Sequence, residues 1–404
     1  MVDAAASPEA GSRTAASVRA ESGSTALKAA VYLDTDEAVR AYGAACSNAT
    51  VSPAQSFAWV SAWIAHTRPD FLVAALASND RPLFAIALEV TRSGSCLVAR
   101  FMSGRHANGN FPPLAGHGQN SLTGDGLQNI ASAIRKARPD IDILAFERMA
   151  DRLDGLENPL LALPHSPSAN LSLAADLTGG FEVLLDRVSG KRKRKKHRSQ
   201  ARKFEAAGGF RRIEAKTAAE TNALLDAFFI MKEERFRKMG IANVFGESNV
   251  QSFFRALFAD ALNAKQPRFV LHGLEVDGKI RAVTGSSRTG SRLVCEFGSI
   301  AEDDLSHTSP GDFLFFENIR EACEIGFDVY DFSVGDEPYK RLWCDLEITQ
   351  FDVLVPLTFK GRLLAGGMRT TSRLKSMVKN SPAVWRIAKA LRRRGSAAPI
   401  SPQD

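Results

Sequence analysis

The chain repeats itself at a shift of about 196 residues, and this repeat limits the fold more than any other feature of the sequence. One copy of the repeated segment, QSFAWVSAWIAHTRPDFLVAALASNDRPLFAIALEV, begins at Gln55, and the other, QSFFRALFADALNAKQPRFVLHGLEVDGKIRAVTGS, begins at Gln251. Each copy predicts a helix, a proline and then three strands, because runs of apolar residues are separated by turn pairs such as Asn79-Asp80 and Asp277-Gly278. The chain therefore reads as a duplication.

The match continues after loops of different length. GDGLQNIASAIRKARPDIDILAFER, from Gly124, parallels GDFLFFENIREACEIGFDVYDFSVG, from Gly311. Each copy then predicts a helix, an antiparallel meander, a second helix and a last strand. The fold class is accordingly α/β, with mixed sheets of the α+β kind in two tandem domains. Chance similarity between two α+β domains is the alternative, and the co-registered Gln-Ser-Phe, proline and Gly-Asp favour duplication.

The length of 404 residues also favours two domains, since a single hydrophobic core stops growing well below this size. Residues 1–27 are rich in Ala, Ser and Gly and predict a disordered tail. We assign the rest of the chain to a first domain, a basic helical connector, a second domain and a basic amphipathic tail, at residues 28–178, 179–214, 215–360 and 361–404.

The net charge of +7 is concentrated in two segments. Nine of the thirteen residues from Lys191 to Lys203 are Lys or Arg, and eleven more follow Asp352. Anionic partners are expected at these two places. The first segment has three readings: a solvated helix face, a site for donor phosphates or an acidic carrier protein, or a surface for RNA or anionic lipid. Aromatic residues do not alternate with its charges, which makes nucleic acid the less favoured partner.

Several classes of protein are disfavoured by spacing and composition. The five cysteines lie far apart without a C-x-x-C pair, and the seven histidines form no H-E-x-x-H motif, so neither a disulfide framework nor a metal site is expected. The sequence holds no apolar run of the length that crosses a membrane, about 18 residues. We expect a cytoplasmic protein, with peripheral contact at the inner membrane through its basic tail helix around Trp385.

The segment VYDFSVGDEPYKRLWCD, residues 329–345, closes the last strand of the second copy. Gly335 permits a sharp break and Pro338 fixes the path of the chain, so that four polar residues leave the sheet edge together: Asp336, Glu337, Tyr339 and Lys340. A salt-bridged surface turn is the structural alternative. The first copy has the strand but lacks the polar segment that follows it. This difference indicates that the second copy carries the catalytic residues and that the first is a structural or acceptor-side partner.

Residues 309–343, SPGDFLFFENIREACEIGFDVYDFSVGDEPYKRLW, resemble the signature of the bacterial CelD-like (BcsL-type) family of GNAT acetyltransferases. QSFAWVSAW and RKKHRSQARKFEAAGGF also resemble that family, so the likeness covers roughly residues 50–360. The paired halves resemble Fem peptidyltransferases more distantly. The likeness implies tandem GNAT-like domains that transfer an acyl group from acyl-CoA or an acyl carrier protein. The implied acceptor is an amine or hydroxyl of an envelope polysaccharide or a ceramide-type lipid precursor.

The resemblance also suggests catalytic residues in the second copy. Asp336 or Glu337 would act as general base, and Tyr339 would protonate the departing thiolate. Lys340 matches a lysine of the Fem family and would stabilise the oxyanion or the leaving group. Asp331 and Glu296 form a second pair of acids that would meet across the central cleft or lie apart as ordinary polar positions.

The donor site is expected at the start of the helix that follows Ser309, although the usual Q/R-x-x-G-x-G/A loop of GNAT enzymes is missing. Ser309 would cap this helix, and Pro310 suits its first turn. Gly311 would leave backbone N–H groups open to a phosphate, and Asp312 would satisfy part of the helix dipole even without a ligand. Two residues of the basic segment, Arg194 and Arg198, complete the expected donor site.

Two other functions stay open at this stage. One is a Fem-like transferase that takes its acyl group from an aminoacyl-tRNA, with the basic helix on the RNA. The other is a non-catalytic module that binds a membrane or an assembly partner.

Overall fold

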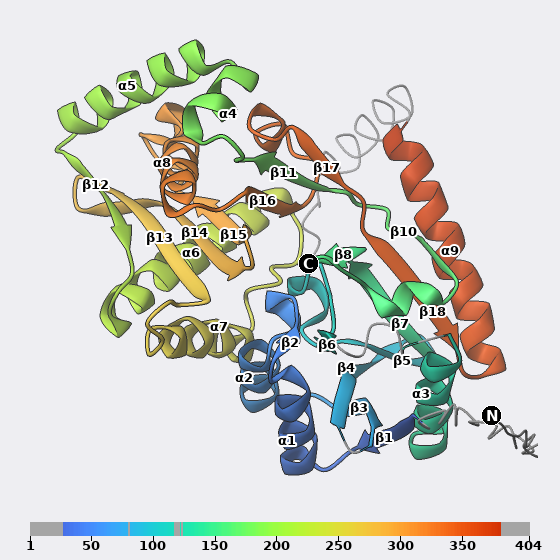
Figure 1. The fold of residues 1–404 in the computed structure, drawn as a ribbon. Coiled ribbons are helices and arrows are strands. Elements are labelled where there is room, and N and C mark those ends of the chain that lie inside the picture. The colour runs from blue at the N-terminus through green and yellow to red at the C-terminus, as the bar shows by residue number, and fades with distance from the viewer. Residues whose placement is uncertain (1–26, 80, 117–121, 123, 381–404) are drawn as a thin grey trace, which may run out of the picture.

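The computed structural model describes residues 27–79, 81–116, 122 and 124–380 and forms two large mixed sheets side by side (Figure 1). The helix predicted after Ser381 lies outside the described residues. The first sheet runs in the order β1, β3, β4, β5, β7, β18, β10, with bounds Lys28–Tyr32, Phe71–Ser78, Arg81–Ser93, Cys96–Phe101, Ile143–Met149, Phe351–Pro356 and His165–Pro167. The second runs in the order β12, β13, β14, β15, β16, β11, β17, with bounds Phe210–Glu214, Phe269–Val276, Lys279–Thr289, Arg292–Ile300, Val329–Val334, Ser172–Asp176 and Leu346–Ile348.

The helices repeat in the same order in both halves. The first half has α1, α2 and α3, at Thr35–Cys46, Phe57–Thr67 and Gly124–Ala137, and the second has α6, α7 and α8, at Ala218–Met239, Ser248–Ala261 and Pro310–Ile325. The first antiparallel pair of each meander is interrupted at the corresponding place, with Leu83 and Arg281 as the unpaired extra residues. The predicted succession of helix, meander, helix and strand is confirmed in both halves.

The two sheets exchange strands, which the sequence did not indicate. β11 follows the first copy in the chain but pairs with β16 of the second sheet, and β18 follows the second copy but pairs with β7 of the first. Each exchanged strand is followed by a basic helical segment: α4 and α5, at Phe181–Arg187 and Gly190–Ala206, after β11, and α9, at Phe359–Asn380, after β18. The sheets therefore do not follow the domain boundaries that we drew along the chain.

A shared hydrophobic core joins the halves where α2 meets α7. Trp59 and Trp63 of α2 contact the ring of Phe253 edge-on, with centroid distances of 5.2 and 5.0 Å. Buried side chains from both halves form one continuous cluster here. Together with the exchanged strands, this packing fixes the two halves against each other and defines the space between them.

Candidate active site

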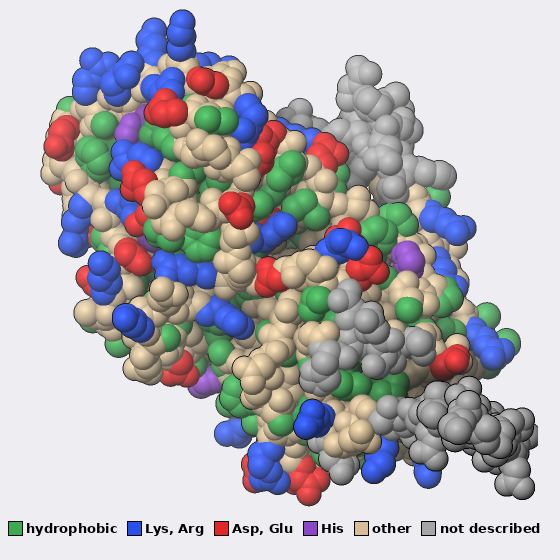
Figure 2. Space-filling view, viewed as in Figure 1, with side chains coloured by type: hydrophobic (Ala, Val, Ile, Leu, Met, Phe, Trp, Pro, Cys, Tyr) green, Lys and Arg blue, Asp and Glu red, His purple; other side chains and the backbone are tan. Residues whose placement is uncertain are grey.

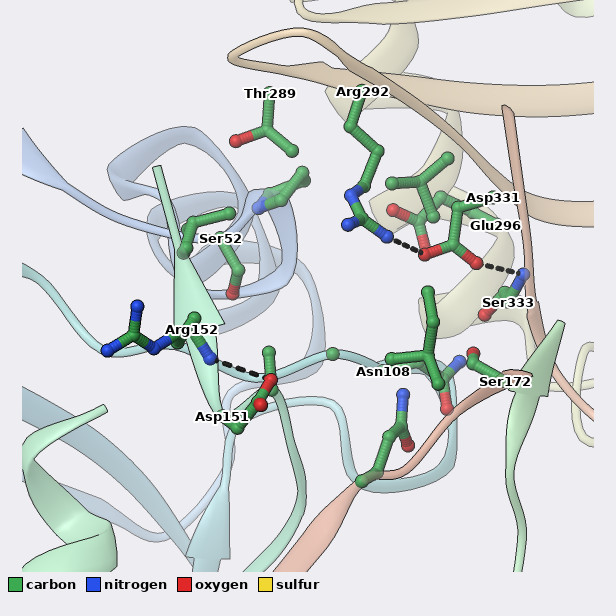
Figure 3. Close-up of a pocket in the computed structure, with 17 residues that line it drawn as sticks. Ser52, Asn108, Asp151, Arg152, Ser172, Thr289, Arg292, Glu296, Asp331 and Ser333 are labelled. Atoms are coloured by element: carbon green, nitrogen blue, oxygen red, sulfur yellow. Dashed lines mark hydrogen bonds and ion pairs between the residues drawn. The ribbon is translucent and has the colours of Figure 1, made fainter. Parts of the chain in front are cut away.

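A cavity lies between the two halves, beside the place where β15 and β16 separate (Figure 3). These parallel strands pair only through residues 292–294 and 329–331, although β15 continues to Ile300. The space is partly open to solvent. The second half contributes Arg292, Glu296, Asp331 and Ser333, and the first contributes Ser52, Asn108, Asp151 and Arg152.

Glu296 enters this cavity from a β-bulge. Gly285 pairs with Phe297 and Ser286 with Cys295, so Glu296 is the extra residue of β15. The hydroxyl of Ser287 donates a hydrogen bond of 2.5 Å to Glu296 Oε1, whereas the buried Oε2 has no hydrogen-bond partner among the described residues. Burial, and to a lesser extent the charge of Asp331, raise the pKa of Glu296 from 4.5 to about 7. A carboxyl group with this pKa can take up or release a proton near neutral pH.

Gly285→Ala tests whether the strand pairing at the bulge requires a residue without a side chain at position 285. A Cβ at this position would lie 2.2 Å from the Phe297 ring, which is held by other aromatic rings of the core. We expect the free energy of unfolding to fall by about 1 to 3 kcal/mol, as for other overpacked cores, measured by denaturant titration. In the matched variant Gly298→Ala the new Cβ would meet its nearest atoms at 3.4 and 3.5 Å, and a smaller loss is expected. Equal losses would contradict the steric explanation.

Asp331 lies beside Glu296 and is held from two sides. Its Oδ2 accepts a hydrogen bond of 2.8 Å from Arg292, and its Oδ1 accepts one of 2.7 Å from the backbone N–H of Ser333. Ser333 has φ of +60°, a strained conformation for a residue other than glycine. The sequence left open whether Glu296 and Asp331 meet or lie apart, and the structure brings them to the same cavity.

Lys340 follows β16 by six residues, at the start of a short 3-10 turn at Lys340–Leu342, and is 4% exposed. Its ammonium donates hydrogen bonds to the carbonyls of Ser333 and Val334, at 3.3 and 2.9 Å, and pairs with Glu337 at 3.0 Å. These three partners match the three N–H bonds of an ammonium group. The described residues that line the cavity do not include Lys340. Its contacts hold the end of β16 next to the cavity. We had expected Lys340 to contact the reacting atoms directly.

The other residues of the exit segment form the turn that was the structural alternative. Asp336 pairs with Arg341 at 2.6 Å, and Arg341 also pairs with Glu347. The ring of Tyr339 stacks on Phe315 of α8 at 5.7 Å, and burial raises the pKa of its hydroxyl. This exit loop lies beyond the described lining of the cavity. The geometry therefore favours Glu296 and Asp331 over residues 336–339 as the reacting carboxylates.

The start of α8 differs in part from the expected donor site. Ser309 occupies the N-cap position as predicted, but it has φ of +60° and its side chain accepts no capping hydrogen bond. Pro310 does occupy the first turn. Gly311 allows close packing, since a Cβ there would lie 2.7 Å from Ile300 of β15. Asp312 accepts a hydrogen bond from the Trp343 indole at 3.2 Å and pairs with Lys196 at 2.9 Å.

The basic segment forms helix α5, which packs across the start of α8 and ends at Ala206, just before Gly208-Gly209. The side-chain amide of Gln200 donates to the carbonyls of Thr308 and Ser309, at 2.8 and 3.0 Å. Lys193 lies 3.4 Å from the Trp343 ring centre, and burial lowers its pKa to about 8. The outer face carries seven exposed cations, Lys191, Arg192, Lys195, Lys196, Arg198, Arg202 and Lys203, and the space-filling view shows Lys and Arg gathered over α5 (Figure 2).

Arg194 and Arg198 were both expected to bind the donor. Arg194 pairs with Glu182 of α4, so its guanidinium is already engaged. Arg198 is exposed on α5. Lys196, which we did not single out from the sequence, pairs with Asp312 in the first turn of α8. It is therefore nearer to the expected donor site than Arg194 is.

One group of side chains has the composition of a metal site. Glu214, His272 and Glu321 have ligand atoms within 4.8 Å of one another, on β12, β13 and α8. Burial lowers the pKa of His272, so its imidazole is neutral, as a metal ligand must be. Arg212, however, already forms a salt bridge with Glu321, and Arg288 lies 3.8 Å from Glu214. These guanidinium groups oppose cation binding.

The cavity residues that the sequence missed come from segments without a recognisable motif. Ser52, Asn108 and Asp151 lie in loops of the first half, and Arg292 reads as an ordinary strand residue. Only the lack of the Tyr-Lys exit in the first copy hinted at a structural or acceptor-side role for the first half. No spacing rule could have joined loops from one half to strands of the other.

The comparisons with known proteins agree with this architecture. Residues 191–341 match the model of the acetyltransferase (GNAT) domain. The crystal structure of FemX is similar, with a TM-score of 0.55, 11% identity, and coverage of 84% of this chain and 99% of that chain. No curated protein matches the sequence.

Two further solved structures resemble the fold at lower scores. The C-terminal domain (DUF2156) of a putative lysylphosphatidylglycerol synthetase from Agrobacterium fabrum has a TM-score of 0.49 and 13% identity, and covers 83% of this chain and 96% of that chain. A tandem GNAT protein from the clavulanic acid biosynthesis pathway has a TM-score of 0.44 and 13% identity, with 82% and 98% covered. The predicted mixed α/β fold with GNAT-like halves is confirmed, and the match of residues 191–341 to the GNAT acetyltransferase domain supports an acyltransferase.

Proposed function

We propose that the protein transfers an acyl group from acyl-CoA to an amine or hydroxyl of an envelope polysaccharide or lipid precursor, with Glu296 as the general base. The observation that carries this proposal is a buried carboxyl group whose pKa is raised to about 7, in a cavity between the halves of a GNAT-type enzyme. The CelD-like resemblance of residues 309–343 supports the class of acceptor. An acyl carrier protein is the alternative donor.

In this mechanism Glu296 Oε2 accepts the proton of the acceptor group while the acceptor attacks the thioester carbonyl. The tetrahedral intermediate then collapses, the carbon–sulfur bond breaks, and the leaving thiolate takes up the proton that Glu296 accepted, which restores the carboxylate. Burial keeps the pKa of Glu296 high, with a smaller contribution from the charge of Asp331, and Arg292 holds Asp331 in position. Ser52, Asn108 and Asp151 of the first half then face the acceptor.

The donor phosphates are assigned to the start of α8 and the neighbouring cations of α5. Backbone N–H groups at a helix start and nearby ammonium groups both favour a phosphate. Gly311 lets α8 approach β15 closely, and Lys196 and Arg198 are candidate phosphate contacts, while Pro310 begins the first turn. Asp312 would have to share Lys196 with the ligand.

Thioester turnover tests the proposed function. The purified protein is mixed with acyl-CoA of several chain lengths, and release of the free thiol is followed with and without amino-sugar or sphingoid-type acceptors. Acceptor-dependent thiol release supports the proposal. Binding of no acyl-CoA and no acyl carrier would exclude it.

The fold similarity to FemX makes an aminoacyl-tRNA-dependent transferase the second candidate. The exposed cations of α5 would then hold RNA, and binding would weaken steeply with salt. Tight, salt-dependent tRNA binding that is lost when Arg192 and Lys195 are neutralised would favour this candidate over a CoA-dependent enzyme.

Among the helices that the structure describes, none has the length and apolar character that a membrane span requires.

A further inference from the structure

Helix α9 lies on the outer edge of the first half, with its inner face against the sheet (Figure 1). Ala365, Leu364 and Met368 pack on a small apolar cluster of β5, β7 and β18. Gly361 lies so close to the backbone carbonyl of Asp142 that a Cβ would come within 1.8 Å of its oxygen. The Thr358 hydroxyl donates a hydrogen bond of 2.6 Å to Asp142 Oδ1, which anchors the start of the helix. These contacts determine which face of α9 points outward.

The outward face carries a stripe of large apolar side chains. Phe359, Leu363 and Leu374 are 72%, 65% and 56% exposed. Their spacings of 4 and 11 residues place them on one side of a helix with 3.6 residues per turn. That side is opposite to Gly361, Ala365 and Met368. An apolar stripe that is kept in solvent on a well-anchored helix indicates a surface that another body covers.

The charges around this stripe identify the partner. α9 contains no acidic residue, and its described cations are Lys360, Arg362, Arg369, Arg373 and Lys375. Arg369 and Arg373 also line a groove between α9 and the edge of the sheet, together with His165. Asp352 is the one acid among the described residues of this groove, and its Oδ1 accepts a hydrogen bond from the Arg148 backbone. Lys and Arg side chains, with green apolar atoms, follow the corresponding edge of the molecule in Figure 2.

We propose that α9 docks the protein on the surface of a bilayer that contains anionic lipids. Phe359, Leu363 and Leu374 enter the interface, and the flanking cations contact the headgroup phosphates. A second copy of the chain fits less well, because a twofold contact through α9 would bring two sets of the same cations together. Three side chains are also too few for a stable protein interface, which buries about 800 Å² on each partner.

The test is co-sedimentation of the full chain with vesicles of phosphatidylcholine alone and of phosphatidylcholine mixed with phosphatidylglycerol. We expect binding only to the mixed vesicles, weakened by salt. The variant Phe359→Ser/Leu363→Ser/Leu374→Ser should lose most of this binding. Arg369→Gln/Arg373→Gln should weaken it by about fivefold for each guanidinium removed. Ile325→Ser is the matched control, since Ile325 is 57% exposed at the end of α8 and should leave binding unchanged.

Three results would overturn the proposal: no binding to the mixed vesicles, equal binding to both kinds, or full binding by the triple serine variant. If that variant instead changed the sedimentation of the protein without vesicles from dimer to monomer, α9 would be a contact between copies and the membrane assignment would be wrong. Because α9 is remote from the described cavity residues, thiol release from soluble acyl-CoA reports separately on the acyl-transfer proposal.

Discussion

Glu296→Gln is expected to reduce acyl transfer by a factor of about 10² to 10⁴, the usual contribution of a general base. The amide has nearly the shape of the carboxyl group and can still accept the hydrogen bond from Ser287, but it cannot take a proton from the acceptor. The measurement is kcat/KM for acceptor-dependent thiol release. Glu302→Gln is the control, because Glu302 pairs with Lys238 outside the described cavity lining and should keep full activity. Normal turnover by Glu296→Gln would remove Glu296 from the mechanism.

The pH dependence provides a second check on the same residue. Since the base must be ionised, kcat/KM of the native protein should rise with pH through about 7, and the residual rate of Glu296→Gln should not show this step. Stability should change in the opposite direction. Folded Glu296 holds its proton between pH 4.5 and about 7 while the unfolded chain has lost it, so its contribution to stability falls as pH rises through this range. Glu296→Gln is therefore expected to be more stable than the native protein at alkaline pH, measured by denaturant unfolding.

Lys340→Met is expected to lower the free energy of unfolding by about 1 to 3 kcal/mol, the cost of leaving buried hydrogen-bonding groups without a partner. Its ion-pair partner Glu337 is itself about half exposed. The substitution leaves the carbonyls of Ser333 and Val334 and the carboxylate of Glu337 without their donor. Activity should fall as well, because the strand end that carries Asp331 and Ser333 loses its support. Denaturant unfolding and thiol release are measured on the same preparations.

Two variants separate this positioning role from a catalytic one. Arg341→Met removes the neighbouring salt bridges, which are partly exposed, and should cost about 1 kcal/mol or less. Adding Glu337→Gln to Lys340→Met should restore part of the lost stability, because it removes the unpaired carboxylate. If Lys340→Met unfolded like the native protein but lost all activity, Lys340 would act on the substrate and the positioning role would be wrong.

The repeat was enough to predict the plan of each half. Gln55 and Gln251 have the same neighbours in sequence, and each lies beside the start of the corresponding helix, α2 or α7. Their side-chain partners differ: the Gln251 side chain donates to Phe245 of the preceding loop, whereas the Gln55 side chain donates to Asn110, which is distant in the chain. Turn pairs such as Asp277-Gly278 depend on a few adjacent residues, which is why they could be read from the sequence.

The candidate site was predicted only in part. Glu296 and Asp331 were named from the sequence as a second choice, behind the Asp336 to Lys340 segment. That ranking followed the density of polar residues along the chain. The sequence does not show burial, which raises the pKa of Glu296. It also does not show the backbone carbonyls at the end of β16, which accept hydrogen bonds from the ammonium of Lys340.

The sequence by itself determined the order of helices and strands in each half, the duplication, and the position of the basic helix α5. These features depend on periodicity, turn residues and charge, all of which act over short distances along the chain. The tertiary structure decided the exchange of β11 and β18, the bulge that turns Glu296 inward, and the meeting of Glu296 with Ser52 and Asn108 across the halves. Those features depend on which surfaces pack together, and packing between distant segments leaves no local pattern in the sequence.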